Sequence, residues 1–338
     1  MKKETIKNSS DFLFIYEAIQ SNPNGDPDQE NKPRMDYDTK TNLVTDTRVK
    51  RFIRDYLKAI NEDEVVFVDM EGDSKVSVDS KLKAVVKRTL EDETKLEKAF
   101  AENPEALKVY KDILKKEKDA EKVWKTITDK KFKPKEVNYE LLAYLVKEKF
   151  IDIRMFGSAF AVGGFTKAYT GPIQLNWGYS FNKVELMDSN SIVTIMNDDS
   201  STFGKDYRVH YSLLGFNGTI NAPAAKTTGL NEEDLTIFRK AIWESIPASP
   251  TRSKVNQYPK LYVEIIYNEG ISNGQFGDLR NLVKTTTKDG LTEKQVRKFS
   301  DLSVDLSKLK SLIEEHKGKD KLIKDVVLKT SVDFDFSL

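Results

Sequence analysis

The first strong pattern along the chain is a short apolar run at residues 11–19, DFLFIYEAI. A run of this length, rich in aromatic side chains and without polar alternation, is typical of a strand that is buried on both faces. The residues that follow it, SNPNGDPDQENKP, are mostly polar residues, Pro and Gly, which favour turns. The pattern therefore predicts a central strand that leads directly into an irregular loop.

A helix is predicted over residues 46–60. Its apolar residues recur at the spacing i, i+3, i+4, i+7, i+8, i+11, which is the signature of an amphipathic helix. Thr45 or Asp46 can cap its start. The apolar positions are Val49, Phe52, Ile53, Tyr56, Leu57 and Ile60.

Later segments alternate between helical and strand character. Residues 80–149 are rich in Lys and Glu with helical periodicity, which predicts an insertion of several helices. Residues 150–162, FIDIRMFGSAFAV, have strand character. Residues 191–196 and 207–216 are expected to pair as a long hairpin around the polar tip 197–206.

The last third of the chain contains a second amphipathic helix, capped by Asn231, whose inward residues are Leu235, Phe238, Ile242 and Ile246. A closing strand is expected at 260–268. The remainder is polar, with one short helix near 304–316 and a final strand-like segment at 325–334. Without the insertions, the order is strand, helix, strand, strand, helix, strand. This order predicts an α+β fold of the ferredoxin-like type, which RNA-recognition-motif domains share.

The composition limits the kinds of catalytic and metal site that the chain can form. The 338 residues contain no Cys and two His, which excludes disulfides, thiolate zinc sites and Cys nucleophiles, and argues against a His-rich metal site. No stretch approaches the roughly 20 apolar residues that span a bilayer. We therefore expect a cytoplasmic protein without membrane contact. A net charge of +1 still permits a local groove for phosphates.

One side of the helix 46–60 is basic. Lys50, Arg54 and Lys58 recur every four residues, Arg51 lies on the same arc, and Arg48 is close. Asp46 and Asp55 are the only nearby acids, and Asp55 lies off the row, so we expect the row to be unrelieved by acidic partners. Such a face is either merely solvated or bound to a polyanion. The preceding loop favours the polyanion, because short amides, a glycine and a cation suit sugar and phosphate oxygens. These loop residues are Asn22, Asn24, Gly25 and Arg34.

Six motifs in order resemble a known family. They are NPNGDPD, KPRMD, LVTDTRVKRFIRDYL, DIRMFGSAFAV, TGPIQLNWGYS and GFNGTINAPAAKTTGL, between about residues 11 and 268. They closely resemble the backbone subunit of the type I CRISPR Cascade complex, the seventh Cas family, in its subtype I-B form. The resemblance implies a modified RNA-recognition-motif palm, a helical finger insertion and a thumb β-hairpin. The implied parts are palm 1–79, fingers 80–150, palm 151–179, thumb 180–206, palm 207–275 and a C-terminal extension 276–338.

The resemblance also implies a function. Copies of such a subunit stack head to tail along a crRNA guide as a helical filament, and the thumb interrupts the pairing of the guide with target DNA. Each copy meets a different guide segment, so its contacts must reach phosphates and riboses rather than base edges. The RNA-binding candidates are Asn22, Asn24, Gly25, Arg34, Arg48, Lys50, Arg51, Arg54, Arg154, Phe156, Gly157, Ser158, Lys167, Gln174 and Asn176.

Further residues are assigned on the same basis. Apolar residues near the hairpin tip can wedge between bases, although ordinary cross-strand packing is an equally good reading. The thumb candidates are Ile195, Met196, Phe203 and Arg208. Loop cations are candidates for the target strand or a neighbouring copy: Lys226, Arg252 and Lys254.

The implied partners are the crRNA guide, the target DNA strand, further copies of the chain and the other Cascade subunits. These are a large PAM-reading subunit, a guide-end-capping subunit and a crRNA-processing endonuclease, joined by a recruited helicase-nuclease. The chain is expected to have no catalytic residues, no cofactor and no metal, and to serve antiviral defence.

Two alternatives stay open. The loop acids Asp26, Asp28, Asp36 and Asp38 permit a metal-dependent ribonuclease of the type III kind, although beside Pro and Gly they are more simply turn formers. A stand-alone RNA-binding module is the other alternative. Its usual sheet motif does not match DIRMFGSAFAV, and its copy number per RNA is the discriminating observation.

Overall fold

The computed structural model describes residues 4–61, 66, 70–71, 74–75, 85, 92–101, 103–129, 131, 135–162, 165–188, 191–197 and 200–338. The chain divides into two compact units. The helical unit comprises Met1–Thr5, Leu57–Pro172 and Ala224–Asp234, and the sheet unit comprises Ile6–Tyr56, Ile173–Pro223 and Leu235–Leu338. Each unit is described by itself.

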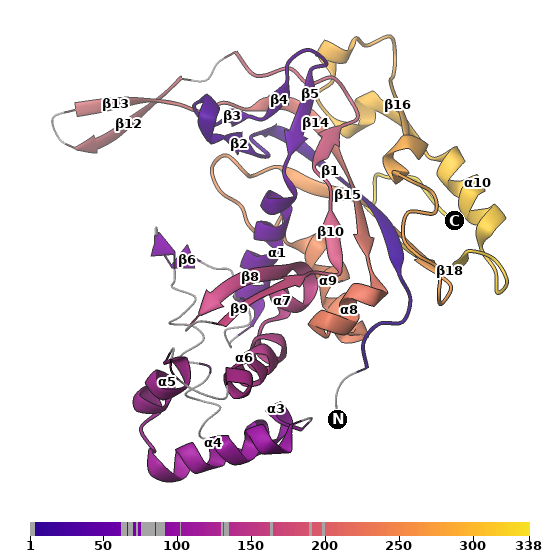
Figure 1. The fold of residues 1–338 in the computed structure, drawn as a ribbon. Coiled ribbons are helices and arrows are strands. Elements are labelled where there is room, and N and C mark those ends of the chain that lie inside the picture. Colours follow the sequence, from indigo (N-terminus) through magenta and orange to yellow (C-terminus); the bar gives the residue numbers. More distant parts are fainter. Residues whose placement is uncertain are drawn as a thin grey trace. The chain divides into compact units, whose positions relative to one another are not determined.

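An antiparallel sheet is the centre of the sheet unit (Figure 1). Its strands lie in the order β18-β15-β1-β14-β11-β5-β4, and β10 also pairs with β14. The strands are β1 (Ser10–Ser21), β4 (Met35–Asp36), β5 (Thr41–Val44), β10 (Ile173–Leu175), β11 (Gly178–Ser180), β14 (Val209–Ile220), β15 (Gln257–Tyr267) and β18 (Ile323–Thr330).

The prediction of a central buried strand is confirmed. β1 pairs with β14 on one side and β15 on the other, and every residue from Ser10 to Ala18 is buried. Its aromatic side chains at positions 12, 14 and 16 share one face, because side chains alternate along a strand. Phe12 contacts Phe238 and Tyr262 through ring centroids 5.7 and 5.6 Å away.

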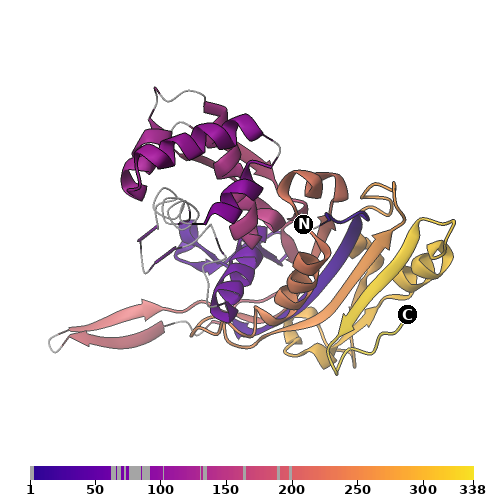
Figure 2. The ribbon, with the colours of Figure 1, turned by 90° about the horizontal axis from the view of Figure 1, so that it is seen from below.

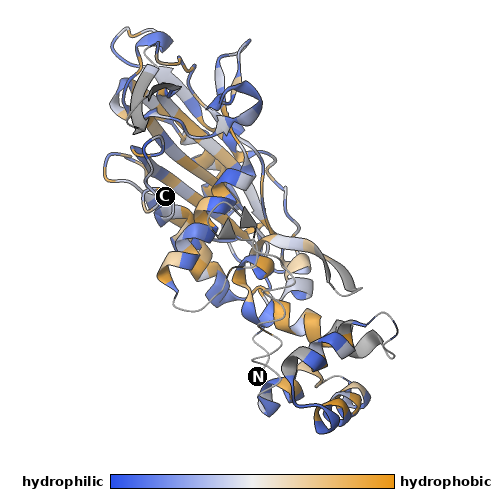
Figure 3. Ribbon diagram, turned by 90° about the vertical axis from the view of Figure 1, so that its left-hand side faces the viewer, coloured by the Kyte–Doolittle hydropathy of each residue, from blue (hydrophilic) through white to orange (hydrophobic). Residues whose placement is uncertain are grey.

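Two helices cover this aromatic face. They are α1 (Asp46–Ile60) and α9 (Glu232–Glu244), and both predictions are confirmed. The predicted apolar positions of α1 are buried except Ile60, and those of α9 are all buried. Asn231 caps α9, since its Oδ1 accepts from the amides of Glu233 and Asp234. Figure 3 shows the hydrophobic residues concentrated along the strands of the sheet.

The opposite face of the sheet is covered by the C-terminal residues. Leu13 and Ile15 of β1 belong to a core that also contains Leu309 and Ile313 of α10 (Ser307–His316). The short elements of this region are η2 (Leu279–Leu282), β16 (Lys284–Thr287), η3 (Glu293–Gln295), η4 (Phe299–Asp301) and β17 (Leu302–Asp305). The expected helix near 304–316 and the final strand are thus present. Beyond the prediction, that strand joins the main sheet beside β15 (Figure 2).

A buried charge cluster fixes the last residues to the sheet. The Lys260 Nζ lies 2.8 Å from a Glu17 oxygen and 2.6 Å from a carboxylate oxygen of Asp333. The buried Phe334 stacks on Phe299, with centroids 5.2 Å apart. Lys260 and Glu17 are both almost fully buried, so they require each other and Asp333 as partners.

Three glycines of the sheet lie directly under aromatic rings. A Cβ on Gly218 would lie 2.2 Å from the Phe12 ring, and one on Gly215 would lie 2.4 Å from the Phe181 ring. Gly178 has the same relation to Phe216, at 2.3 Å. The rings therefore occupy space that any other residue at these positions would need.

The expected hairpin is wrong in its second strand. β12 (Ser191–Asn197) pairs with β13 (Ser200–Lys205), which lies inside the segment expected to be a polar tip. Residues 209–220 instead form β14 of the main sheet. Their apolar side chains are buried there, whereas the β12–β13 hairpin extends away from the sheet (Figures 1 and 2).

The helical unit contains α3 (Glu93–Ala99), α4 (Pro104–Lys116), α5 (Ala120–Thr128), α6 (Lys135–Lys149) and α7 (Ile151–Phe156). Four of these fall within the predicted helical insertion and share one apolar core, whereas most of 80–91 lies outside the described residues. The expectation of a strand at 150–162 is wrong for its first half, because 151–156 form α7. The second half is β8 (Gly157–Val162), paired with β9 (Phe165–Thr170). The unit also contains β6 (Met70–Glu71) and β7 (Ser74–Lys75), and most of α8 (Ala222–Thr228).

Within the part of the chain that the structure describes, no helix is long and apolar enough to cross a membrane.

Candidate nucleic-acid interface

The loop between β1 and α1 is a tightly bonded small hairpin in the sheet unit. β2 (Gly25–Asp26) pairs with β3 (Lys32–Pro33), and η1 (Pro27–Gln29) joins them. Asn22 is only 2% exposed and donates from Nδ2 to the carbonyl of Asn31 at 2.8 Å. A Cβ on Gly25 would lie 1.8 Å from the Asn31 Oδ1, so a larger residue there requires the Asn31 side chain to move. The loop is therefore held in one shape by its own contacts.

The same loop positions the start of α1. Oδ1 of Asn24 accepts from both the amide and the hydroxyl of Thr45, each at 2.9 Å. The Thr45 hydroxyl lies 3.3 Å from the amide of Arg48, as a helix cap does. Asn24 thus uses its side-chain oxygen to fix the first turn of the basic helix.

The expectation that the basic row lacks acidic partners is wrong. Lys50 lies 2.9 Å from Asp46 and 3.3 Å from Oε1 of Gln174, and its side chain is 12% exposed. Arg51 pairs with Asp55 at 2.8 Å and remains 36% exposed. Both partners are four residues away on the helix, where side chains of one face meet. The Arg51–Asp55 pair is exposed enough to be weak and to exchange readily for a stronger anion, whereas the Lys50–Asp46 pair is more enclosed.

Residues 174–177 place polar and aromatic groups beside this helix. Gln174 belongs to β10, and Asn176 is exposed, with its Oδ1 accepting from the Trp177 amide at 2.8 Å. The Trp177 side chain is exposed, and the guanidinium of Arg34 lies 5.9 Å from its ring. Arg34 also approaches Asp26 at 3.4 Å.

The base of the β12–β13 hairpin is tied to the loop. The Tyr207 hydroxyl donates to the Glu30 carboxylate at 2.8 Å, and the Lys205 Nζ lies 3.2 Å from the same oxygen. The Tyr207 hydrogen bond, followed by Lys205, lowers the pKa of Glu30. The hairpin therefore starts from a fixed position beside the loop.

Two arginines, Arg208 and Arg252, lie at the base of the β12–β13 hairpin. Arg208 pairs with Asp206 at 2.8 Å and donates to the carbonyls of Gln20 and Arg252 at 3.0 and 2.9 Å. The side chain of Arg252 is largely exposed and lies 3.3 Å from the same Asp206. Arg208 thus holds two loops together, while Arg252 faces solvent.

Arg48 and Lys254 are two partly buried cations of this surface. The Lys254 amine donates to the Asn22 carbonyl, and burial together with the charge of Arg48 lowers the pKa of Lys254 to about 7. Arg48 lies over the Phe52 ring, 3.9 Å from its centroid. Burial also lowers the pKa of Arg48.

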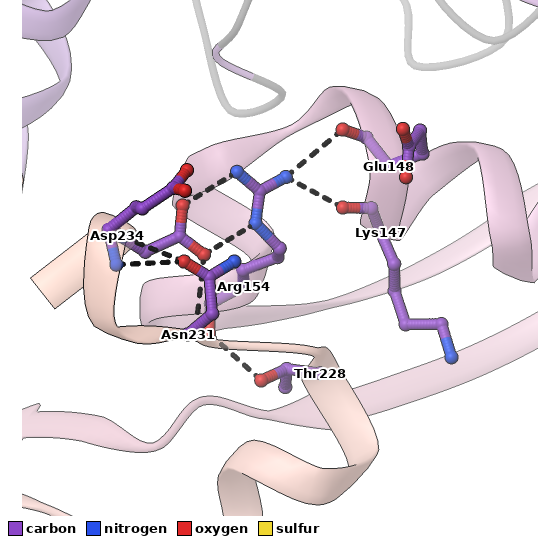
Figure 4. A network of polar contacts seen from close by, with 7 residues as sticks. Lys147, Glu148, Arg154, Thr228, Asn231 and Asp234 are labelled. Carbon is purple, nitrogen blue, oxygen red and sulfur yellow. Dashed lines mark hydrogen bonds and ion pairs between the residues drawn. The ribbon is translucent and has the colours of Figure 1, made fainter. Parts of the chain in front are cut away.

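In the helical unit, Arg154 is the centre of an internal network (Figure 4). Its guanidinium makes two 2.8 Å bonds with the Asp234 carboxylate and donates to the carbonyls of Lys147 and Glu148 at 2.7 and 3.1 Å. Its own carbonyl accepts from the Thr228 hydroxyl at 2.9 Å. This arrangement joins α6, α7, α8 and the start of α9, and directs Arg154 into the protein.

Three neighbours of Arg154 were also candidates. Phe156 is buried in α7, and the Ser158 hydroxyl lies 3.4 Å from the carbonyl of Ala159. Gly157 ends α7 with φ +70°, and a Cβ there would lie 2.0 Å from the carbonyl oxygen of Tyr169. Both its conformation and its surroundings require glycine. Lys226 is exposed in the last turn of α8.

The backbones of four other candidates are placed, but their side chains lie outside the described part. Lys167 lies in β9, opposite Phe160. Ile195 and Met196 lie in β12, and Phe203 lies in β13 opposite Val193.

The acidic loop residues act as turn acceptors. Oδ1 of Asp26 accepts from the Asp28 amide at 3.2 Å, and Oδ1 of Asp36 accepts from the amides of Asp38 and Thr39 at 3.1 and 3.3 Å. Hydrogen bonds from Thr39 lower the pKa of Asp36. Among the described residues, no group of three acidic or His side chains is arranged to hold a metal ion.

Several residues of this surface were not expected from the sequence. Asn31 and Asp206 lie in polar turns with no motif to single them out. Asn31 bonds to Asn22 within the same loop, and Asp206 pairs with Arg252, which is distant in the chain. Tyr16 belongs to an apolar strand, where its interaction with Arg48 had no signal. Thr45 was recognised as a cap, but not as the partner of Asn24.

Comparison with known proteins gives consistent matches. A family model described as CRISPR-associated protein Cas7 matches residues 8–307. A CRISPR-associated protein Cas7 from Haloferax volcanii is 28% identical over 333 residues, which cover 92% of this chain and 84% of that protein. A chain of a CRISPR RNA-guided surveillance complex, pre-nicking, superposes with a TM-score of 0.51 at 14% identity, covering 97% of this chain and 94% of that chain. A second surveillance-complex chain gives a TM-score of 0.39 at 14% identity over 78% of each chain.

Proposed function

Because the chain belongs to the Cas7 family of CRISPR-associated proteins, we propose that it is a crRNA-binding backbone subunit of a type I Cascade complex, of a form like subtype I-B. In this role many copies assemble head to tail along one guide and hold its backbone while the guide pairs with target DNA. The complex then serves antiviral defence together with its PAM-reading, guide-capping and crRNA-processing subunits and a recruited helicase-nuclease.

The strand order supports a modified RNA-recognition-motif palm. β15, β1, β14 and β11 are neighbours, α1 follows β1, and α9 follows β14. This is the arrangement of a β-α-β-β-α-β unit. The helices α3 to α6 are proposed as the fingers, and the β12–β13 hairpin as the thumb.

The observation that carries the proposal is the gathering of backbone-directed groups from separate segments of the sheet unit. The loop 22–34 fixes the start of α1. Gln174 contacts Lys50 of this helix, and Trp177 lies near Arg34 of the loop. These groups are cations, amides and one exposed aromatic ring, a set that suits phosphates, riboses and the faces of bases of any identity. A repeated guide-binding subunit requires RNA contacts of this kind, which do not depend on the base sequence.

The surface cations are proposed to contact phosphates directly. Arg51 and Arg54 are half-exposed on α1, and their neighbour Lys50 has one carboxylate and one amide partner. On RNA binding, phosphates replace the carboxylates as ion-pair partners, and counterions leave the RNA. Arg154, by contrast, is proposed as a structural residue of the helical unit, because its guanidinium is engaged by Asp234 and two carbonyls.

The proposed role is non-catalytic. The four loop aspartates of the alternative ribonuclease are not converging on one point, since Asp26 and Asp36 each serve a separate local turn. Turn formation accounts for these carboxylates without a metal.

The test is assembly on RNA by a triple variant, Lys50→Ala, Arg51→Ala and Arg54→Ala. Each lost phosphate contact on a single strand lowers the dependence of log K on log salt by about 0.7, so the three together should lower it by about 2. The matched control is Lys108→Ala, Lys115→Ala and Lys116→Ala on α4. Electrophoretic mobility and native mass spectrometry on a repeat-flanked RNA report affinity and copy number. Unchanged assembly of the α1 variant, folded by circular dichroism, would contradict the proposal, as would a single copy per RNA for the wild type.

A further inference from the structure

The face of the sheet beneath the start of α1 carries polar groups where a hydrophobic core is expected. Ser212 and Gln257 flank Ala18 on the two neighbouring strands, and Tyr16 is two residues before Ala18 on the same face. All three polar side chains are at most 1% exposed. The row therefore lies deep in the sheet unit, on the side covered by α1.

These buried groups have unsatisfied atoms. Among the described residues, Tyr16 Oη, Ser212 Oγ and Gln257 Oε1 have no hydrogen-bond partner, and neither do Asn22 Oδ1 and Arg48 Nε. Leaving buried polar atoms without partners is unfavourable, so such atoms generally mark a place where water or a ligand is bound. Here both donors and acceptors are left over, which favours a small hydrated site.

The charges around this site are unbalanced. Lys254 faces Arg48 from α1 and Asp206 from the turn after β13, and its amine contacts the Asn22 carbonyl. Asp206 is already paired with Arg208 and Arg252. Arg48 faces Tyr16, Arg51 and Asp55, and Asp55 is bound by Arg51. Neither Arg48 nor Lys254 is within ion-pair distance of a carboxylate among the described residues.

Two partly buried cations that repel each other lower the stability of the fold, because charges taken out of water are normally paired. An anion bound by both removes this cost. Arg48 and Lys254 both supply charged hydrogen-bond donors. That set suits a tetrahedral oxyanion with several acceptor oxygens.

We propose that Arg48 and Lys254 form a recessed site for one phosphate-class oxyanion, above a hydrated floor of Tyr16, Ser212 and Gln257, and that the oxyanion enters together with a proton taken up by the Lys254 amine. Where the oxyanion is a phosphate of the guide, the inference rests on the function proposed above and adds a proton-linked subsite to it. A free phosphate or sulfate ion is the other source of the same chemistry.

Because burial lowers the pKa of Lys254, binding of an oxyanion should be accompanied by uptake of a proton. An amine with a pKa of about 7 is mostly neutral at pH 8, and a bound oxyanion returns it to the charged form. Uptake at pH 8 should therefore be about 0.9 proton per bound subunit, and affinity should fall roughly eightfold between pH 7.5 and 8.5.

The experiment is calorimetric titration of the full chain with a single-stranded RNA at pH 8, in Tris and in HEPES. These buffers have different ionisation enthalpies, so the difference in apparent binding enthalpy counts the protons taken up. The wild type should take up most of one proton. Lys254→Arg should take up none, because its side chain is always charged. Lys284→Arg, at an exposed position of β16, is the control and should behave as the wild type.

A second arm uses sulfate without RNA. Sulfate also stabilises proteins in general, so the measured quantity is the increase in melting temperature of the wild type minus that of Lys254→Met. A positive difference supports the oxyanion site even if RNA does not bind, in which case the guide-binding function fails and the free ion is the ligand. RNA binding with equal enthalpy in both buffers overturns the proton-linked site while the proposed function stands. Absence of both RNA binding and a sulfate difference overturns both.

Discussion

At the scale of single residues, the loop before α1 contains a glycine, Gly25, that lies directly against the Asn31 side chain. Gly25→Ala would place a methyl group within 1.8 Å of Oδ1 of Asn31 and 3.0 Å of its carbonyl oxygen. We expect a loss of about 1–3 kcal/mol in the free energy of unfolding, as for other overpacked sites, and a larger loss of RNA affinity because Asn22 and Asn24 move with the loop. Urea denaturation and RNA titration measure the two effects.

Asn31→Gly supplies the control for this prediction. Asn31 has φ +60°, which glycine adopts readily, so the single variant should be close to neutral. Combined with Gly25→Ala it should recover part of the lost stability, because it removes the nearest clashing atoms. A double variant no better than Gly25→Ala alone would show that the Asn31 side chain is not the obstacle.

Arg154 provides a second residue-scale prediction. Its pairing with the almost fully buried Asp234 means that Arg154→Ala leaves a carboxylate without its charge partner, at a cost of about 3–5 kcal/mol. Asp234→Asn should cost a similar amount, and the double variant clearly less than their sum. Chemical denaturation checks this. Additive losses would contradict the coupling of Arg154 with Asp234. Normal stability of Arg154→Ala combined with weakened RNA binding would instead support a direct contact of Arg154 with RNA.

At the scale of elements, the β12–β13 hairpin can be shortened without affecting the main sheet, since within the described part of the chain these strands pair only with each other. Replacing residues 194–202 by a two-glycine turn should leave guide binding nearly unchanged. Target capture should change, because the proposed thumb no longer reaches the guide–target duplex. Target-strand binding by the assembled complex measures this, and a similar shortening of the exposed turn 288–291 is the control. Unchanged target capture would exclude the hairpin as the thumb.

The elements that the sequence predicted well are those with local signals. The apolar run of β1 and the periodicity of α1 and α9 require no knowledge of the rest of the chain. The hairpin prediction was wrong because 209–220 is the more apolar strand, and burial beside β1 outweighs local pairing with β12. Residues 151–156 were misassigned because a short apolar run looks alike in a buried helix and a buried strand.

At the scale of the whole chain, the C-terminal residues are predicted to depend on pH through Asp333. Lys260 holds the pKa of Asp333 below its usual value against the opposing effect of burial. A lowered pKa in the folded state contributes stability above the unfolded value, near 4, that is lost as pH falls through the folded pKa. Asp333→Asn should therefore melt at a lower temperature than the wild type at pH 7, with a difference that shrinks below about pH 4.

Asp335→Asn is the control for this prediction, because Asp335 is an exposed residue of the same segment. It should melt like the wild type at both pH values. A difference between Asp333→Asn and the wild type that persists unchanged at pH 3.5 would mean that the ion pair with Lys260 is not its source.

The candidate site was predictable in its parts but not in its assembly. The basic residues of α1 and the Asn-rich loop were evident, because both lie in one continuous segment. Lys254 was assigned to a different partner, since nothing local shows that its loop returns to Asn22 and Arg48. The pairing of Lys50 with Asp46 was overlooked, although their spacing along the helix permits it.

The glycines beneath aromatic rings in the sheet have a consequence for how the family diverges. We expect each ring and its glycine to change together: Phe12 with Gly218, Phe181 with Gly215, and Phe216 with Gly178. A relative that acquires a bulkier residue at 215 must first lose the ring at 181, and a relative that keeps the ring retains the glycine. An alignment of many family members should therefore show these three pairs of columns changing together.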